Sequence, residues 1–237
     1  MPVSTKQNCR AAVLVFLLVA GFEGKAQIKG SQAAADNVLE RMGAAGKDFR
    51  SFQANFTQKN YVAVLREFDD PESGIFIYAR AKDGSALVRQ EYKAPGRKIL
   101  TIKGGEAVVY QPSLNQASKI NLGKNRDKAE FLALGIGQTP AKMRETFNVE
   151  YIGEEKIAGT ACSMLLLKPK NSAVSAYFAS ITLWISNASN LPVQQKLTEP
   201  NGNYMLNTFT SEKLNPKVSE FDFEQKLPKG VEIQIIK

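Results

Sequence analysis

The side chains that most often carry out acid–base or nucleophilic chemistry are scarce in this chain. It contains no histidine, which removes the commonest general base, the usual metal ligand and every serine–histidine or cysteine–histidine nucleophile arrangement. Acidic residues cluster at Asp69, Asp70 and Glu72 and again at Glu154 and Glu155, and paired acids can cleave glycosides or bind calcium. Both clusters fall at predicted turns, where acidic side chains are usually solvated. We therefore expect no catalytic residue, no metal site and no cofactor.

Two further features that resemble reactive or binding motifs also favour structural roles. Cys162 lies in the apolar, strand-like run 161–167 with no basic residue beside it, so a buried core thiol is a better interpretation than a nucleophile. The glycines at Gly104-Gly105 and Gly135-Ile136-Gly137 fit hairpin and helix ends better than a phosphate-binding loop between a strand and a helix. Nucleotide binding therefore has little support.

The N-terminus has the order of a secretory signal. Lys6 and Arg10 precede the ten-residue apolar run AAVLVFLLVA at residues 11–20, and small residues follow, as in a signal peptide. The run is too short for a membrane span, which needs about 20 apolar residues. We predict a cleavable signal peptide at residues 1–26 and a single exported domain at residues 27–237.

Cysteine use and charge set further limits on the exported domain. Cys9 precedes the apolar run, whereas the cysteine of a lipoprotein signal follows it, so no lipid anchor is expected. Removal of residues 1–26 takes away three positive groups and one negative group, which lowers the formal net charge from +8 to +6. The remaining lysines are scattered and form no block. We interpret them as a solvated surface and expect no nucleic acid partner.

An alternation of period two identifies a β domain. Phe52, Ala54, Phe56 and Gln58 alternate with polar residues, which predicts a long, half-buried strand. Similar runs recur every eight to twelve residues, separated by turn residues. The further predicted strands are 74–80, 86–92, 98–103, 106–111, 116–122, 147–155, 160–168, 177–186, 192–198 and 204–210.

Three helical pieces accompany these strands. Ser31 is a candidate cap for a helix over residues 33–42, residues 129–134 look helical, and Thr139 and Pro140 open a helix over residues 140–146. So few crossovers predict one large curved sheet or an open barrel of antiparallel strands, with helices available to cover its mouth.

The strands carry more apolar surface than one sheet face needs to bury. Residues 74–78, 161–167 and 181–185 have bulky side chains at successive positions, and therefore on both faces of the strand. Such strands need helices, a second cover or an apolar ligand against them. The pattern alone leaves open whether the helices simply cap a filled core.

Several short motifs succeed one another in order along residues 31–237. The most specific is SFQANFTQK at residues 51–59. The others are Ser73-Gly74-Ile75-Phe76, residues 89–92 with Pro95, Gly105 to Pro112, residues 131–135 with Thr139-Pro140, and Phe221-Asp222-Phe223 with residues 227–231. This succession resembles the LolA-type periplasmic carriers of outer-membrane lipoproteins.

The resemblance implies a mainly β fold with helices: an unclosed antiparallel β-barrel of about eleven strands with a helical lid over an apolar cavity for acyl chains. It implies a soluble, monomeric periplasmic protein that is not an enzyme. Its partners would be acylated lipoproteins or other lipids, an inner-membrane ABC-type release complex and a possible outer-membrane acceptor. Such a cover is needed because a sixteen-carbon chain exposed to water costs about 12 kcal/mol.

The same resemblance suggests which residues form the site. On the lid side we expect Leu39, Met42, Leu132, Leu134 and Met143. On the concave wall we expect Phe56, Phe76, Tyr78, Leu87, Val109, Leu165, Leu183 and Ile185. The family's lid-locking arginine, six residues after a glycine, falls on Arg80, although Ala81 replaces its usual following proline and Gln90 replaces a tryptophan.

Two other interpretations remain at this point. One is a carrier of another lipid, or a periplasmic sensor of lipoprotein state, on the same fold. The other is a β-rich interaction protein whose core is filled by its own side chains.

Overall fold

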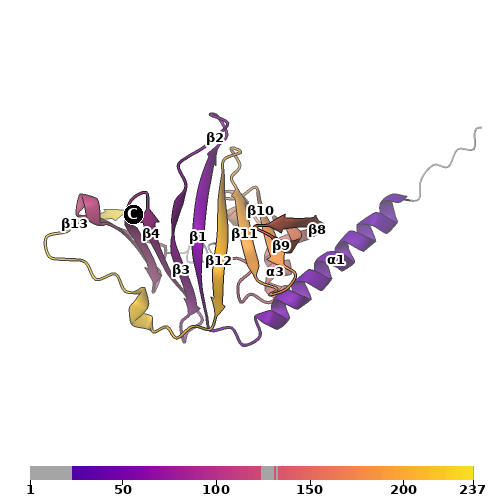
Figure 1. The fold of residues 1–237 in the computed structure, drawn as a ribbon, viewed down its shortest axis with the longest axis horizontal. Coiled ribbons are helices and arrows are strands. Elements are labelled where there is room, and N and C mark those ends of the chain that lie inside the picture. The colour runs from indigo at the N-terminus through magenta and orange to yellow at the C-terminus, as the bar shows by residue number, and fades with distance from the viewer. Residues whose placement is uncertain (1–22, 124–130, 132, 237) are drawn as a thin grey trace, which may run out of the picture.

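The computed structural model describes residues 23–123, 131 and 133–236, with side chains described from residue 31 onward. Its strands form one sheet, flanked by helical segments (Figure 1). The strands are β1 (Ser51–Val62), β2 (Glu67–Phe68), β3 (Glu72–Arg80), β4 (Ala86–Ala94), β5 (Lys98–Lys103), β6 (Glu106–Gln111), β7 (Gln116–Asn121), β8 (Phe147–Ile157), β9 (Thr160–Pro169), β10 (Ser180–Ser186), β11 (Pro192–Thr198), β12 (Tyr204–Leu214) and β13 (Glu232–Ile236). The helices are α1 (Glu23–Ala45), α3 (Pro140–Thr146) and α4 (Ser172–Ser175), with 3₁₀ turns η1 (Pro112–Leu114) and η3 (Glu220–Phe223).

The sheet is long and does not close. Its order is β13-β7-β6-β5-β4-β3-β1-β12-β11-β10-β9-β8, with β2 paired to β1, so β13 and β8 are the two edges. Strand pairs are antiparallel except β13 with β7. The predicted unclosed barrel with helices is therefore confirmed. The described part has thirteen strands instead of about eleven, because the short β2 and the terminal β13 add to the predicted strands.

The two faces of the sheet have different covers. We call the face that contacts α1 and residues 133–136 the inner face, and the opposite one the outer face. In β1, Phe52, Ala54, Phe56 and Gln58 are buried on the inner face, as the alternation predicts. The outer face of β3 to β6 is covered by the C-terminal segment, residues 215–231, through Phe223, Leu227 and neighbours (Figure 1).

The helices differ from the predictions in their extent. Ser31 does not cap a helix; it lies inside α1, and its hydroxyl donates to the Tyr151 carbonyl at 3.0 Å. The helix over residues 140–146 is confirmed, since the Thr139 side chain accepts a hydrogen bond from the Lys142 amide and Pro140 occupies the first turn. Of the predicted helix 129–134, residues 129, 130 and 132 lie outside the described residues, and residues 133 and 134 form a turn instead. β10 begins three residues later than expected, because Asn171 caps the short helix α4.

Gly74 permits a close approach of β3 and β4. A Cβ atom at this position would lie 1.8 Å from the Glu91 carbonyl oxygen, where β3 and β4 pair with a register shift. Backbone atoms cannot move aside as a flexible side chain can, so the two strands would have to separate.

We predict that Gly74→Ala lowers the free energy of unfolding by at least about 2 kcal/mol, since it forces overpacking against backbone. Gly96→Ala is the matched control, because a Cβ there meets nothing within 4 Å. Chemical denaturation of the three proteins measures the difference. Equal stabilities of the two variants would contradict this account of the β3–β4 contact.

Candidate functional site

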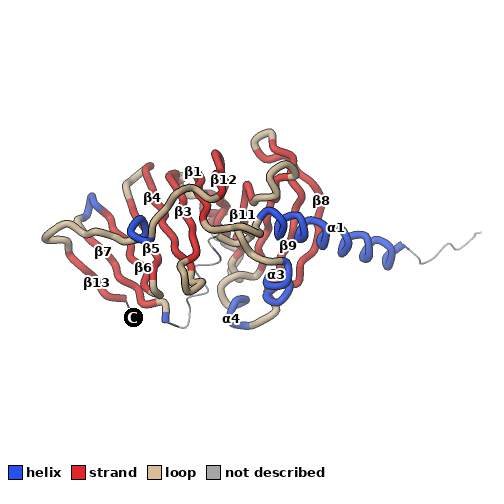
Figure 2. The backbone as a smooth tube through the Cα atoms, turned by 90° about the horizontal axis from the view of Figure 1, so that it is seen from below, coloured by secondary structure: helices blue, strands red, loops and turns tan. Residues whose placement is uncertain are grey.

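The helices contact one half of the inner face. Leu39 and Met42 of α1 pack in one cluster with Leu134 and Met143 and with three strand residues, Leu165, Leu183 and Ile185. All seven side chains are at most 6% exposed. Figure 2 shows α1, α3 and α4 gathered at the β8–β9 end of the sheet. The structure thus brings together the predicted lid residues of these helices and the predicted wall residues of β9 and β10.

The other half of the inner face is mainly aromatic. Phe56, Phe76 and Tyr78 are buried there with Phe52 and Phe209, and Ala133 and Ile136 pack against them. The rings are in contact: the Phe76 and Phe209 centroids are 5.7 Å apart. We call residues 131 and 133–138 the lid segment, because this segment contacts both halves of the inner face.

Three predicted wall or lid residues need separate comment. Leu87 is a correction: it lies on the outer face against Phe223, because Val88 beside it takes the inner position in β4. Val109 is half-buried and shares its face of β6 with Ala107, an inner-face residue. Leu132 lies outside the described residues.

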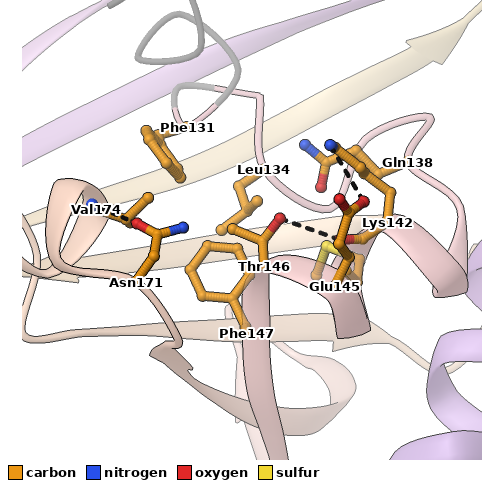
Figure 3. A pocket seen from close by; sticks show the side chains of 10 residues that line it. Phe131, Leu134, Gln138, Lys142, Glu145, Thr146, Phe147, Asn171 and Val174 are labelled. Atoms are coloured by element: carbon orange, nitrogen blue, oxygen red, sulfur yellow. Dashed lines mark hydrogen bonds and ion pairs between the residues drawn. The ribbon is translucent and has the colours of Figure 1, made fainter.

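A pocket of about 250 Å³ opens between the lid segment, α3 and α4. Phe131, Leu134, Met143 and Phe147 form its apolar side, whereas Lys142 and Glu145 of α3 form an ion pair at its polar side (Figure 3). This volume is below the roughly 300–1,000 Å³ typical of small-molecule sites. An alkyl chain would therefore need the lid segment to move away from the inner face.

Gln195 attaches the lid segment to the sheet and was not singled out from the sequence. Its side-chain amide donates to the Leu134 carbonyl at 2.7 Å, and the residue is fully buried in β11. Buried backbone carbonyls need a partner, and this bond supplies one. The sequence feature that could have indicated this role is a polar residue, Gln195, at an inward-facing position of β11, two residues before the buried Leu197.

Arg80 makes local contacts at the end of β3. Its guanidinium donates to the Gly84 carbonyl at 3.3 Å and lies 5.9 Å from the Tyr78 ring, which stacks on Phe49. Phe49 in turn would contact any Cβ at Gly137 of the lid segment. The lid-locking role of Arg80 stays a prediction.

Polar contacts join α1 to α3. The Arg144 guanidinium donates to the Asp36 carboxylate at 2.8 Å, and this hydrogen bond holds the pKa of Asp36 below its usual range. Close packing accompanies it, since a Cβ at Gly43 would lie 2.7 Å from Cδ of Pro140. The two helices therefore form one unit beside the lid segment.

Cys162 is buried on the outer face with Trp184 and Val193. Burial raises the pKa of its thiol, which donates to the Thr160 carbonyl at 3.2 Å. A raised pKa disfavours the thiolate that nucleophilic attack needs.

Among the described residues, no group of three or more acidic or cysteine side chains is placed to hold a metal ion. No helix in the described part of the chain has the length and apolar character needed to cross a membrane.

The fold and the inner face define a class of protein: an open β-barrel with a helical cover, as in lipid- and lipoprotein-binding proteins. The family model described as "Outer membrane lipoprotein carrier protein LolA" matches residues 47–226. The chain belongs to the LolA family, whose members are carrier or binding proteins. A search of curated proteins finds no match.

Solved structures share the fold at low sequence identity. An uncharacterized conserved protein from Thermus thermophilus matches with a TM-score of 0.50 and 15% identity, covering 86% of this chain and 99% of its own. MucB matches with a TM-score of 0.49 and 16% identity over 82% of this chain, which spans 63% of MucB's length. LprF from Mycobacterium bovis matches with a TM-score of 0.46 and 12% identity, covering 85% of this chain and 99% of its own.

We predict that Gln195→Met loosens the lid segment, because it leaves the Leu134 carbonyl unpaired at a cost of about 1–3 kcal/mol. Hydrogen–deuterium exchange of the peptide containing residues 133–136 should become about tenfold faster or more. Gln194→Met is the control, since Gln194 accepts from Thr208 on the outer face. Equal exchange in both variants would show that Gln195 does not hold the segment.

We also predict a pH-dependent contribution from Asp36. Because its folded-state pKa is lowered, the pairing stabilises the protein above the unfolded pKa of about 3.9 and is lost as pH falls through the lower folded-state value. Asp36→Asn should therefore reduce stability at pH 7 by less than about 1 kcal/mol, as for exposed ion pairs. The difference in stability between variant and parent should shrink as the pH falls below about 3.9. A difference that stays constant over that range would contradict this role of Asp36.

Proposed function

We propose that this protein is a periplasmic carrier that shields the acyl chains of lipoproteins on its inner sheet face and shuttles them from the inner to the outer membrane. One observation carries the proposal. In sheet order the apolar inner face spans the strands from β6 to β8, and its described cover is α1, α3, α4, the lid segment and a few loop residues. A single sheet with a cover of this kind can exchange part of that cover for a ligand.

The energetics favour such an exchange. Each methylene transferred from water to an apolar site contributes about 0.8 kcal/mol, so a sixteen-carbon chain gains roughly 12 kcal/mol on burial. Displacing the lid segment costs the burial of a few side chains, each worth about 1.5–3 kcal/mol. In the described part of the segment, Ala133, Leu134 and Ile136 are at most 2% exposed and Phe131 is 7% exposed. The ligand therefore gains enough to replace them.

Part of the inner cover, Ile136 of the lid segment, can move without the helices. Gly135 and Gly137 adopt positive φ angles of 86° and 66°, which glycine reaches without strain. They lie on either side of Ile136 in the lid segment. Rotation of the backbone at Gly135 and Gly137 would move Ile136 away from the aromatic half of the inner face and leave α3 in place. Reversible binding is better supported by such a hinge than by a rigid pocket.

Location and partners follow from the N-terminal sequence and the family. A signal peptide at residues 1–26 would export the domain to the periplasm, where lipoproteins cross between the two membranes. An inner-membrane ABC-type release complex would load the carrier, and an outer-membrane acceptor would receive the cargo. The protein would act as a monomer, without a cofactor and without enzymatic activity.

The direct test is to purify the exported protein from its own cells and identify bound molecules by mass spectrometry. We expect acylated lipoproteins to co-purify, and the delipidated protein to take up a fluorescent fatty acid. Bound free lipid without lipoproteins would instead indicate a carrier or sensor of another lipid. Failure to bind any acylated peptide or fatty acid would indicate an interaction protein with a filled core and end the carrier proposal.

Arg80→Leu tests the proposed lid lock. We predict that the variant loads cargo normally but passes it on more slowly, because loss of the lock leaves the opened, loaded form more stable relative to the closed, empty one. Transfer of a labelled lipoprotein to acceptor membranes measures the rate. Lys82→Leu is the control, since it removes the same charge from the exposed turn nearby. Unchanged transfer in Arg80→Leu would remove Arg80 from the mechanism.

A further inference from the structure

A row of amide side chains crosses the middle of the apolar inner face. Gln195 of β11 pairs with Asn207 of β12, and Asn207 pairs with Gln58 of β1. All three are buried, with exposures of 0%, 4% and 6%. Directly opposite residues on one sheet face have Cβ atoms about 4.5–5.5 Å apart. The three amides therefore form a continuous polar strip between two apolar clusters.

Two of these amides have oxygens without a hydrogen-bond partner. Within the described residues, Oε1 of Gln195 and Oδ1 of Asn207 are fully buried and unpaired. The nitrogens are engaged: that of Gln195 donates to the Leu134 carbonyl, and that of Asn207 faces the Met205 sulfur at 3.4 Å. An unpaired buried carbonyl lowers the stability of the fold by about 1–3 kcal/mol. The two oxygens therefore destabilise the protein unless a ligand donates hydrogen bonds to them.

The third amide, that of Gln58, has a hydrogen-bond partner for its oxygen. The Tyr92 hydroxyl donates to Oε1 of Gln58 at 3.3 Å. Burial and the Glu72 charge raise the pKa of Tyr92, so this hydroxyl keeps its proton and remains a donor. The strip thus ends in a complete donor–acceptor pair at β1 and in free acceptors at β11 and β12.

One of the two free acceptors borders a small internal cavity. Asn207 lines a space of about 10 Å³ together with Gln90 and the rings of Phe56, Phe76 and Phe209. That volume is at the limit for a single water molecule. It lies on the aromatic half of the inner face, close to where Ala133 and Ile136 of the lid segment pack. Displacement of Ile136, with Leu134 still bonded to Gln195, would enlarge this space next to Asn207.

We propose that Gln195 and Asn207 form a recognition site for a hydrogen-bond donor, a hydroxyl or amide N–H, carried at the polar end of an alkyl chain. The inference rests on the proposed function and deepens it, because it assigns the chemical class of the ligand's head. Both free groups are acceptors, so a head that offers only acceptors, such as an ether, a tertiary amide or a carboxylate, leaves them unpaired. The chain itself occupies the flanking apolar clusters.

The test compares ligands that differ by one donor. Competitive displacement of a bound fluorescent fatty acid from the delipidated, full-length exported protein gives the affinity of 1-dodecanol against dodecyl methyl ether, and of N-methyldodecanamide against N,N-dimethyldodecanamide. We expect the donor-bearing member of at least one pair to bind about tenfold more tightly, as one buried hydrogen bond provides. Selectivity in the alcohol pair points to a free lipid, and selectivity in the amide pair to an N-acylated peptide.

The variant Asn207→Leu tests whether Asn207 causes the preference for donor-bearing ligands. It removes one acceptor and keeps the Gln195 tether to Leu134, and replacing a buried amide by an apolar side chain of similar size is tolerated. The donor preference should fall to about threefold or less, whereas Gln194→Leu on the outer face should retain the wild-type preference. Circular dichroism and thermal unfolding establish that both variants are folded.

The outcomes separate the two proposals. Equal affinities within both ligand pairs in the wild-type protein would overturn the donor site while leaving the carrier function in place. A donor preference that is unchanged in Asn207→Leu would also overturn it. If none of the four ligands displaces the probe because the probe itself does not bind, the carrier function fails and the donor site fails with it.

Discussion

The apolar inner face of one open sheet must be covered, and the rest of the structure depends on how that is done. A sheet with both faces rich in bulky residues is stable only if each face meets other apolar surface. The outer face meets the C-terminal segment through Phe223 and Leu227. The inner face meets α1, α3 and the lid segment. Of these described covers, the inner one contains the segment with hinge-like glycines, Gly135 and Gly137.

The inner cover is held by helix packing and by hydrogen bonds. Gly43 lets Pro140 approach closely where α1 packs on α3, and Asp36 pairs with Arg144 there. A buried hydrogen bond from Gln195 to Leu134 attaches the lid segment to the sheet. Because Gln195 bonds to the lid segment, displacement of that segment from Gln195 would expose the Gln195 amide together with apolar surface. The site would then match an amphiphile better than a pure hydrocarbon.

Sequence periodicity predicted the strands well and the side-chain directions less well. β5, β6 and β11 have the predicted bounds, because turn residues punctuate them on both sides. Leu87 was misplaced because β4 has apolar residues at two successive positions, Leu87 and Val88, so alternation alone does not choose a face. β13 was missed although Val231, Ile233 and Ile235 alternate with polar residues. Its parallel pairing with the distant β7 does not follow from that alternation. Gln195 was missed because its role depends on a carbonyl 61 residues away.

The most direct measurement of the central claim is photolabelling with a fatty acid that carries a diazirine near its methyl end. Neighbouring residues of β9 and β10 point to opposite faces, so the labelled positions report which face holds the chain. The account predicts labels on inner residues such as Leu165, Leu183 and Ile185 and on the lid segment. Labels confined to the outer residues Cys162 and Trp184, or to the surface under the C-terminal segment, would contradict it.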